Sequence, residues 1–133
     1  MNVRDMDDVT MALKSGGAQV IDVRSAERFT GVEQEAREGV RSGHMPGSVN
    51  VYYKDLLQSD ATMKSPDELR SIFDAAGVDL KKPIITTCGS GVTAAIASLG
   101  LEMIGYHGAA VYDGSWTEWG GTEDNSVNTG PAK

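Results

Sequence analysis

An uncharged stretch from Pro83 to Leu101 constrains the fold more than any other part of the sequence. It opens with β-branched residues up to Thr87, which is typical of a central strand. From Thr93 to about Ile104 the sequence is apolar almost all round, which is typical of a buried helix. Glycine, serine and threonine interrupt the stretch, so it is not the continuous apolar span that a bilayer core requires. We therefore predict a buried strand, a short connecting loop and a buried helix.

Strands and helices alternate along the chain, which is the pattern of an α/β fold with a central, mostly parallel sheet flanked by helices on both faces. The best-signalled helix begins at the N-cap Ser65, has proline at its first position and an acid at its third, and should run to about Ala76. Further helical segments are expected at 8–14, 54–57 and, after a turn and cap at 113–115, 116–119; strands are expected at 18–23, 48–51, 83–87 and 109–112. Residues 30–47 are polar and glycine-rich, which predicts a long loop.

The chain has 133 residues and a mass of 14.1 kDa, the size of one compact domain. We predict that residues 1–120 form this domain. Residues 121–133 are mainly Gly, Asn, Thr, Ser and Glu without apolar spacing, so we expect a flexible C-terminal tail there.

The charge balance and the cysteine content exclude several classes of function. Twelve basic against 19 acidic residues give a formal net charge of −7, which opposes binding to nucleic acid or to an anionic membrane. The single cysteine, Cys88, cannot form an internal disulfide, and a zinc site would have to combine it with His44, His107 and carboxylates. We expect no metal and no cofactor. The N-terminus lacks the pattern of a signal or transit peptide, so a cytoplasmic location is expected.

Cys88 stands where the predicted central strand ends and a glycine-containing turn leads into a helix. Ligands bind beyond the carboxyl ends of parallel strands, and the first N–H groups of a helix are unpaired donors there. Such donors suit a thiolate, the reactive form of cysteine, and Gly89 and Gly91 let the backbone curl around the sulfur. The alternative interpretation is that Cys88 is a small buried hydrophobic residue.

A cysteine-dependent phosphatase loop is disfavoured. Such a loop carries an arginine at the sixth position after the cysteine, where this chain has Ala94. No cation lies between Pro83 and Leu101 to hold a phosphate dianion. The two glycines of the loop are also too few for a dinucleotide-binding fingerprint.

The loop Cys88-Gly-Ser-Gly-Val-Thr93 resembles the active-site loop of the rhodanese-like sulfurtransferases, in the form found in the C-terminal catalytic domain of mercaptopyruvate sulfurtransferases. The likeness extends over roughly residues 5 to 120 and implies a single rhodanese-like domain. Other blocks that carry it are Val20-Ile-Asp-Val-Arg24, Arg28-Phe29, Gly43-His-Met-Pro-Gly-Ser-Val-Asn50 and Tyr112-Asp-Gly-Ser-Trp-Thr-Glu-Trp119.

The resemblance implies transfer of a sulfane sulfur from a small-molecule donor to Cys88, followed by removal of the persulfide sulfur by an acceptor. It makes Cys88 the nucleophile and Ser90 a participant in proton handling, although Ser90 can also be a plain turn residue. Arg28 and Arg37 match two arginines that hold the donor carboxylate; otherwise they are surface residues. The loop residues expected to line the substrate are Gly89, Gly91, Val92 and Thr93.

The neutral loop favours 3-mercaptopyruvate as donor over thiosulfate, a dianion that gains from cations beside the thiol. Because one cysteine cannot resolve its own persulfide, the acceptor must be external, such as thioredoxin, glutathione or cyanide. The family's mercaptopyruvate enzymes have two such domains, which leaves three options: an open site, a site completed by a second rhodanese-like domain or partner chain, or a single-domain persulfide carrier or regulatory module.

Several other residues are interpreted as structural. Asp22 and Arg24 should brace the end of the first predicted strand, and His44 should fix a turn by hydrogen bonding. His107 is expected on the surface. The two tryptophans, Trp116 and Trp119, are expected to anchor the last helix to the core.

Overall fold

The computed structural model describes residues 2–89 and 93–132 and contains one parallel sheet with strand order β1-β5-β4-β2-β3. The strand at its centre, β4, pairs with β2 and β5, and its register places Ile21 beside Thr86 and Thr86 beside Val111. The strands are β1 (Asn2–Arg4), β2 (Gln19–Asp22), β3 (Val49–Asn50), β4 (Ile84–Thr87) and β5 (Ala110–Tyr112). The predicted parallel α/β sheet is thus confirmed.

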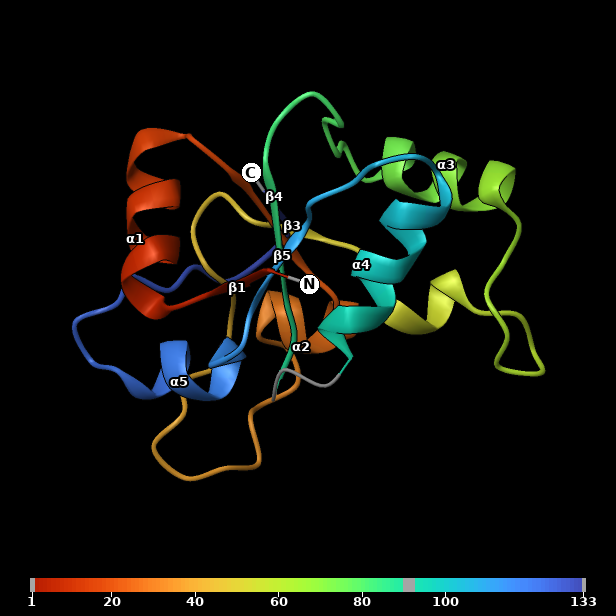
Figure 1. Cartoon of the computed structure of the whole chain (residues 1–133). Helices are drawn as coiled ribbons and strands as arrows, with labels where there is room; N and C mark the ends of the chain where they lie inside the picture. The colour runs from red at the N-terminus through yellow and green to blue at the C-terminus, as the bar shows by residue number, and fades with distance from the viewer. Residues whose placement is uncertain (1, 90–92, 133) are drawn as a thin grey trace.

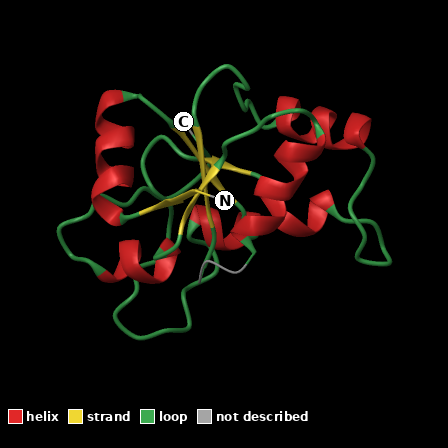
Figure 2. Cartoon of the chain, in the orientation of Figure 1, coloured by secondary structure: helices red, strands yellow, loops and turns green. Residues whose placement is uncertain are grey.

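Helices cover both faces of this sheet, with α1 and α5 on one side and α3 and α4 on the other (Figure 1, Figure 2). The helical elements are α1 (Met6–Ser15), α2 (Ala26–Thr30), the 3-10 helix η1 (Tyr53–Leu56), α3 (Pro66–Ala75), α4 (Ala94–Met103) and α5 (Ser115–Gly121). No helix in the described part of the chain is long and apolar enough to cross a membrane.

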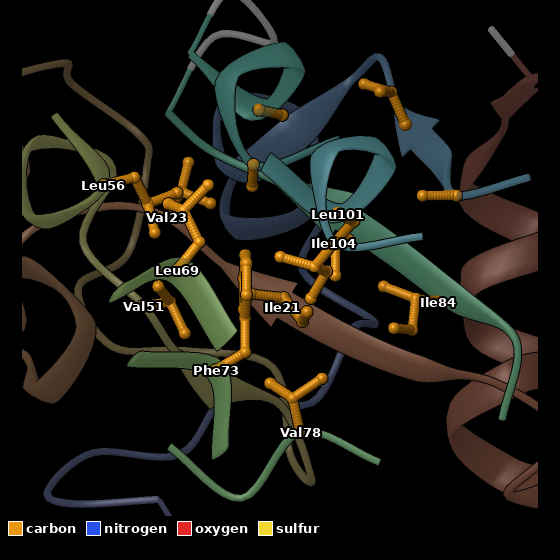
Figure 3. Close-up of a cluster of buried hydrophobic side chains, with 14 of the residues drawn as sticks. Ile21, Val23, Val51, Leu56, Leu69, Phe73, Val78, Ile84, Leu101 and Ile104 are labelled. Atoms are coloured by element: carbon orange, nitrogen blue, oxygen red, sulfur yellow. The ribbon is translucent and has the colours of Figure 1, made fainter. Parts of the chain in front are cut away.

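Two hydrophobic clusters lie on the two faces of the sheet, because successive strand residues point to opposite sides. Ile21 and Ile84 belong to the cluster under α3 and α4, which includes Phe73 and Leu101 (Figure 3). Their neighbours Val20 and Ile85 belong instead to the cluster on the side of α1 and α5. A central strand buried on both faces explains why the uncharged stretch of the sequence begins here.

The helix ends follow their sequence signals. Ser65 Oγ accepts the Glu68 N–H in a capping box at the start of α3, and Asp5 and Asp8 form the same arrangement at the start of α1. Gly16 ends α1 in the left-handed conformation at φ 70°, which glycine adopts at little cost.

Two elements were not expected from the sequence. Helix α2 has only five residues, too few to show a helical period, although Ser25 caps its start and Gly31 ends it. Strand β1 has three residues at the sheet edge, and its position depends on pairing with β5, which lies more than 100 residues further along the chain. Local pattern carries no information about that pairing.

The segment after α5 differs from the expected flexible tail, because residues 122–130 pack along the domain. Asn128 exchanges two backbone hydrogen bonds with His44, at 2.8 and 2.9 Å, and Gly130 N–H donates to Thr30 O at 2.8 Å. Trp119 Nε1 donates to Ser126 O at 3.0 Å. The composition of this segment is polar, but its backbone groups find partners at Thr30, His44 and Trp119, which no local pattern reveals.

Candidate active site

Cys88 directly follows β4, at the carboxyl end of the central strand, and its residue is 1% exposed. Its backbone N–H donates to Ser115 Oγ at 3.3 Å, and its Sγ lies 3.8 Å from the same oxygen. The sulfur therefore occupies the ligand-binding edge of a parallel sheet, as the sequence predicted.

Ser115 contacts Cys88, whereas the sequence analysis expected it only in the turn and cap that precede the last helix. It is fully buried and has a positive φ of 54°, a conformation that residues other than glycine rarely adopt. Its Oγ lies 2.9 Å from Tyr112 O and 3.8 Å from Cys88 Sγ, so its proton can be donated to either. The sequence could have indicated this contact. Residues that follow adjacent parallel strands meet at one edge of the sheet, and Ser115 comes after β5 while Cys88 comes after β4.

The N-terminal turn of α5 holds the backbone of the cysteine loop. Trp116 N–H donates to Cys88 O at 2.8 Å, and Thr117 donates to Gly89 O through its N–H at 3.0 Å and through its Oγ1 at 2.7 Å. Both carbonyls are thereby turned toward α5 and fixed there. The first part of the loop has a defined direction before any ligand binds.

Arg28, from α2, lies beside this loop. A β-carbon at Gly89 would stand 3.3 Å from Arg28 Nη2 and 3.6 Å from Nη1, so a side chain at this position would crowd the guanidinium. Arg28 is paired with Glu35, whose hydrogen bond is the main reason that the pKa of the guanidinium lies above its ordinary value. The structure thus brings one of the two predicted carboxylate-binding arginines next to Gly89, the residue that follows Cys88.

Glu35 also contacts Arg24, and Arg24 is held in a buried network. Arg24 forms a two-pronged ion pair with Asp22, with a shortest distance of 2.7 Å, and donates to Gly43 O at 2.6 Å. Its guanidinium stacks 4.3 Å from the ring centre of Trp116. These contacts agree with the structural role that was predicted for Asp22 and Arg24.

A pocket of about 460 Å³ opens beside Arg28. Gly89 and Thr93 line it from the cysteine loop and the start of α4, while Tyr52 and Tyr53 line it from the chain that enters η1. This volume is in the range of sites that hold small molecules.

The remaining predicted site residues are not all brought to this pocket. Arg37 is exposed in the loop between α2 and β3, and its side chain forms no hydrogen bond or ion pair with another described residue. Thr93 precedes α4 and lines the pocket without capping the helix through its side chain. Ser90, Gly91 and Val92 lie outside the described residues.

The two histidines are engaged away from the cysteine. His44 is buried, its Nδ1 lies 2.9 Å from Phe29 O, and its ring stacks on Phe29 with 3.9 Å between ring centres. His107 is exposed and lies 2.6 Å from Glu102. Over residues 2–89 and 93–132, no group of three or more His, Cys, Asp or Glu residues is placed to hold a metal ion.

Comparison with known proteins gives consistent matches over most of the chain. A model of the family described as rhodanese-like domain matches residues 5–122. Human 3-mercaptopyruvate sulfurtransferase is 44% identical over 117 residues, which cover 88% of this chain and 39% of the human protein. Mouse thiosulfate sulfurtransferase is 42% identical over 118 residues, 88% of this chain and 40% of the mouse protein.

A solved structure agrees with these matches. The crystal structure of SseA from Escherichia coli, a 3-mercaptopyruvate sulfotransferase, is 41% identical and superposes with a TM-score of 0.74 over 86% of this chain and 42% of SseA. The chain spans about two fifths of the length of the relatives that it matches.

Proposed function

The chain belongs to the rhodanese-like domain family, and from this membership we propose that it is a sulfurtransferase that moves sulfur from 3-mercaptopyruvate to an external acceptor through a persulfide on Cys88. The observation that carries the proposal is the position of Cys88 at the carboxyl end of β4, with the Arg28 guanidinium beside the neighbouring Gly89. Arg28 and Gly89, the residue that follows the proposed nucleophile, thus line one pocket.

In the first half-reaction the Cys88 thiolate attacks the sulfur of 3-mercaptopyruvate. The sulfur–carbon bond breaks, its electron pair remains on carbon as the enolate of pyruvate, and this carbon takes up a proton. Arg28 holds the carboxylate through its fork of N–H donors, and Arg37 and Ser90 are proposed as the second carboxylate ligand and a proton-handling residue. Gly89, Gly91, Val92 and Thr93 are proposed to line the substrate.

In the second half-reaction a nucleophilic acceptor attacks the outer sulfur of the persulfide, and the Cys88 thiolate leaves. Thioredoxin, glutathione and cyanide are acceptors of this chemistry. We propose a cytoplasmic location, which a chain with a single cysteine and therefore no internal disulfide supports.

Thiosulfate is the alternative donor, and the similarity to mouse thiosulfate sulfurtransferase favours testing it. The charge of the site supports 3-mercaptopyruvate instead, because the carboxylates of Glu27 and Glu33 line the same pocket as Arg24 and Arg28. A dianion gains little from a pocket in which carboxylates stand beside the arginines. A persulfide carrier that acts with a partner protein is the second alternative.

Intact-protein mass spectrometry tests the proposal. After brief exposure to each donor without reductant, the protein should gain one sulfur atom, about 32 Da by atomic mass, and lose it on addition of cyanide. The Cys88→Ser variant should gain nothing. If the folded protein forms no adduct with either donor, autonomous sulfur transfer is contradicted. If the protein takes up one sulfur atom but does not convert cyanide repeatedly, it is a persulfide carrier.

A further inference from the structure

The carboxylate of Glu35 lies between Arg24 and Arg28, the two arginines that line the pocket. Its Oε1 lies 2.5 Å from Arg28 Nη2 and its Oε2 lies 3.1 Å from Arg28 Nε, so it grips the side edge of the guanidinium with both oxygens. Oε2 also lies 3.4 Å from Arg24 Nη1. The Glu35 side chain is 6% exposed, whereas the Arg28 side chain is 37% exposed. A buried acid therefore holds an arginine that faces solvent.

The support behind Glu35 is rigid. Its backbone N–H donates to Ser42 Oγ at 3.1 Å. Arg24, on its other side, is fixed by Asp22 and Gly43 O and by the face of Trp116. Glu35 is thus anchored by its backbone at Ser42 and by its side chain at Arg24, and from this position its carboxylate defines where the Arg28 guanidinium lies.

The pairing leaves a particular part of Arg28 available. Glu35 occupies Nε and one N–H of Nη2, and the remaining donors are on Nη1 and the outer side of Nη2. These same two nitrogens are the atoms nearest to Gly89. The end of the guanidinium fork that no residue in 2–89 or 93–132 engages is therefore presented on the side of Gly89, where a carboxylate can accept two hydrogen bonds.

The pairing also changes the charge of the site. Asp22 and Glu35 are ion-paired with Arg24 and Arg28 and offset the positive charge of both arginines, and the carboxylates of Glu27 and Glu33 line the same pocket. The site then recognises an anion by the geometry of the fork and not by net charge. A planar monoanionic carboxylate fits this arrangement, while a dianion finds little added attraction.

We propose that Glu35 is the positioning residue that makes Arg28 a carboxylate-selective fork, and that loss of its charge shifts the site toward dianions. The role of Glu35 in turnover of 3-mercaptopyruvate rests on the proposed function. The selective binding of an α-keto carboxylate is independent of sulfur transfer.

Binding of pyruvate, an α-keto carboxylate without the reactive sulfur, tests the positioning directly. By calorimetry, Glu35→Gln and Glu35→Asp should each bind pyruvate roughly tenfold more weakly than the wild type, because the fork is no longer held. Inorganic sulfate should bind Glu35→Gln more tightly, by roughly threefold or more, and should not gain on Glu35→Asp, which keeps the negative charge. Glu38→Gln, an exposed acid of the same loop, is the matched control and should change neither affinity.

A double-mutant cycle shows whether Glu35 acts through Arg28. In an Arg28→Ala background, Glu35→Gln should cause no further loss of pyruvate affinity. An equal loss in both backgrounds, unchanged pyruvate binding in both Glu35 variants, or a wild type that binds no pyruvate would overturn the inference. If Glu35→Gln fails to fold, Glu35→Asp retains the charge between the arginines and still tests the position.

Steady-state kinetics then connect the inference to turnover. Glu35→Asp should raise KM for 3-mercaptopyruvate roughly tenfold while kcat changes less than about threefold, a split that general loss of structure does not produce. If the wild type forms no persulfide, the proposed function fails, yet the pyruvate and sulfate affinities still decide the role of Glu35.

Discussion

The hydroxyl of Ser115 connects Cys88 to the neighbouring strand. It accepts the Cys88 N–H at 3.3 Å, lies 3.8 Å from Sγ and can donate to Tyr112 O at 2.9 Å. A hydrogen bond to a thiolate stabilises the charged form, and an N–H held by the hydroxyl fixes the backbone that carries the sulfur. At the residue scale, reactivity and local order therefore share one side chain.

Replacing Ser115 by alanine should lower the free energy of unfolding by about 1–3 kcal/mol, because the buried Cys88 N–H loses its acceptor. Replacing it by glycine removes the same hydroxyl but relaxes the positive φ of 54°, so this variant should be the more stable of the two. Both should form persulfide more slowly than the wild type, by roughly tenfold. Thermal unfolding measures the change in stability, and mass spectrometry of samples quenched at successive times measures the rate of persulfide formation. If both variants form the persulfide at the wild-type rate, the hydroxyl is not needed for the reaction.

The two candidate carboxylate ligands differ in their surroundings. Arg28→Ala removes a group that already lines the pocket, and Arg37→Ala removes an exposed side chain of the following loop. Each should raise KM for 3-mercaptopyruvate more than for thiosulfate, with the larger increase, roughly tenfold or more, for Arg28. Both variants should remain folded, although Arg28→Ala removes a partner of the buried Glu35 carboxylate and should therefore unfold at a lower temperature than Arg37→Ala. Equal losses with the two donors would indicate a general structural effect.

At the scale of elements, the site lies where two units meet. The unit β4–loop–α4 carries Cys88, and the unit β5–turn–α5 supplies the donors that hold the carbonyls of Cys88 and Gly89. Parallel pairing of β4 with β5 brings the two carboxyl ends together. Helices α3 and α4 pack on the face of the sheet opposite α1 and α5. Changes at the ends of α3 and α4 that lie away from Cys88 should therefore affect stability without affecting the chemistry.

Ser65→Ala tests this separation at the capping box of α3. Loss of the Ser65 side chain removes the acceptor for the Glu68 N–H and should reduce the free energy of unfolding by about 1 kcal/mol. The kcat/KM for 3-mercaptopyruvate should remain at the wild-type value. Ser71→Ala, at an exposed interior position of the same helix, is the control and should leave stability unchanged within about 0.5 kcal/mol. A kinetic defect in Ser65→Ala would show that α3 is coupled to the site.

At the scale of the whole molecule, the two ends of the chain complete the domain. Strand β1 forms one edge of the sheet by pairing with β5, and residues 122–130 lie along the loop that precedes β3. The fit between these segments is close, because a side chain at Gly43, which has a φ of 126°, would collide with the carbonyl of Asn128. Val127 adds to the cluster beneath α1 and α5.

A chain that ends after Asp124 should therefore be less stable, by about 4 kcal/mol, because it loses the two His44–Asn128 hydrogen bonds, the Trp119 indole partner and the Gly130 bond, and each of these four hydrogen bonds is worth roughly 1 kcal/mol. Denaturant unfolding measures the difference. A chain that ends after Gly130 keeps these contacts and should match the full sequence. If the two truncated chains are equally stable, residues 125–130 contribute nothing to folding.

The local sequence determined most of the elements of this protein and the place of Cys88 at the end of β4. The capped helix α3, the β-branched strand β4 and the apolar helix α4 each carry their signal within about a dozen residues, because period, caps and glycine stops are local physical properties. A cysteine between such a strand and such a helix had to lie at the carboxyl edge of a parallel sheet. The motif resemblance supplied the chemistry expected there.

Only the tertiary structure decided which distant groups complete the site. Ser115 reaches Cys88 across 27 positions, Asn128 meets His44, and Glu35 joins Arg24 to Arg28 from a loop without periodicity. These contacts depend on strand order and on where a loop closes, and neither is encoded in the spacing of neighbouring residues. Burial then gives them their strength, because ion pairs and hydrogen bonds shielded from water hold a geometry that exposed ones do not.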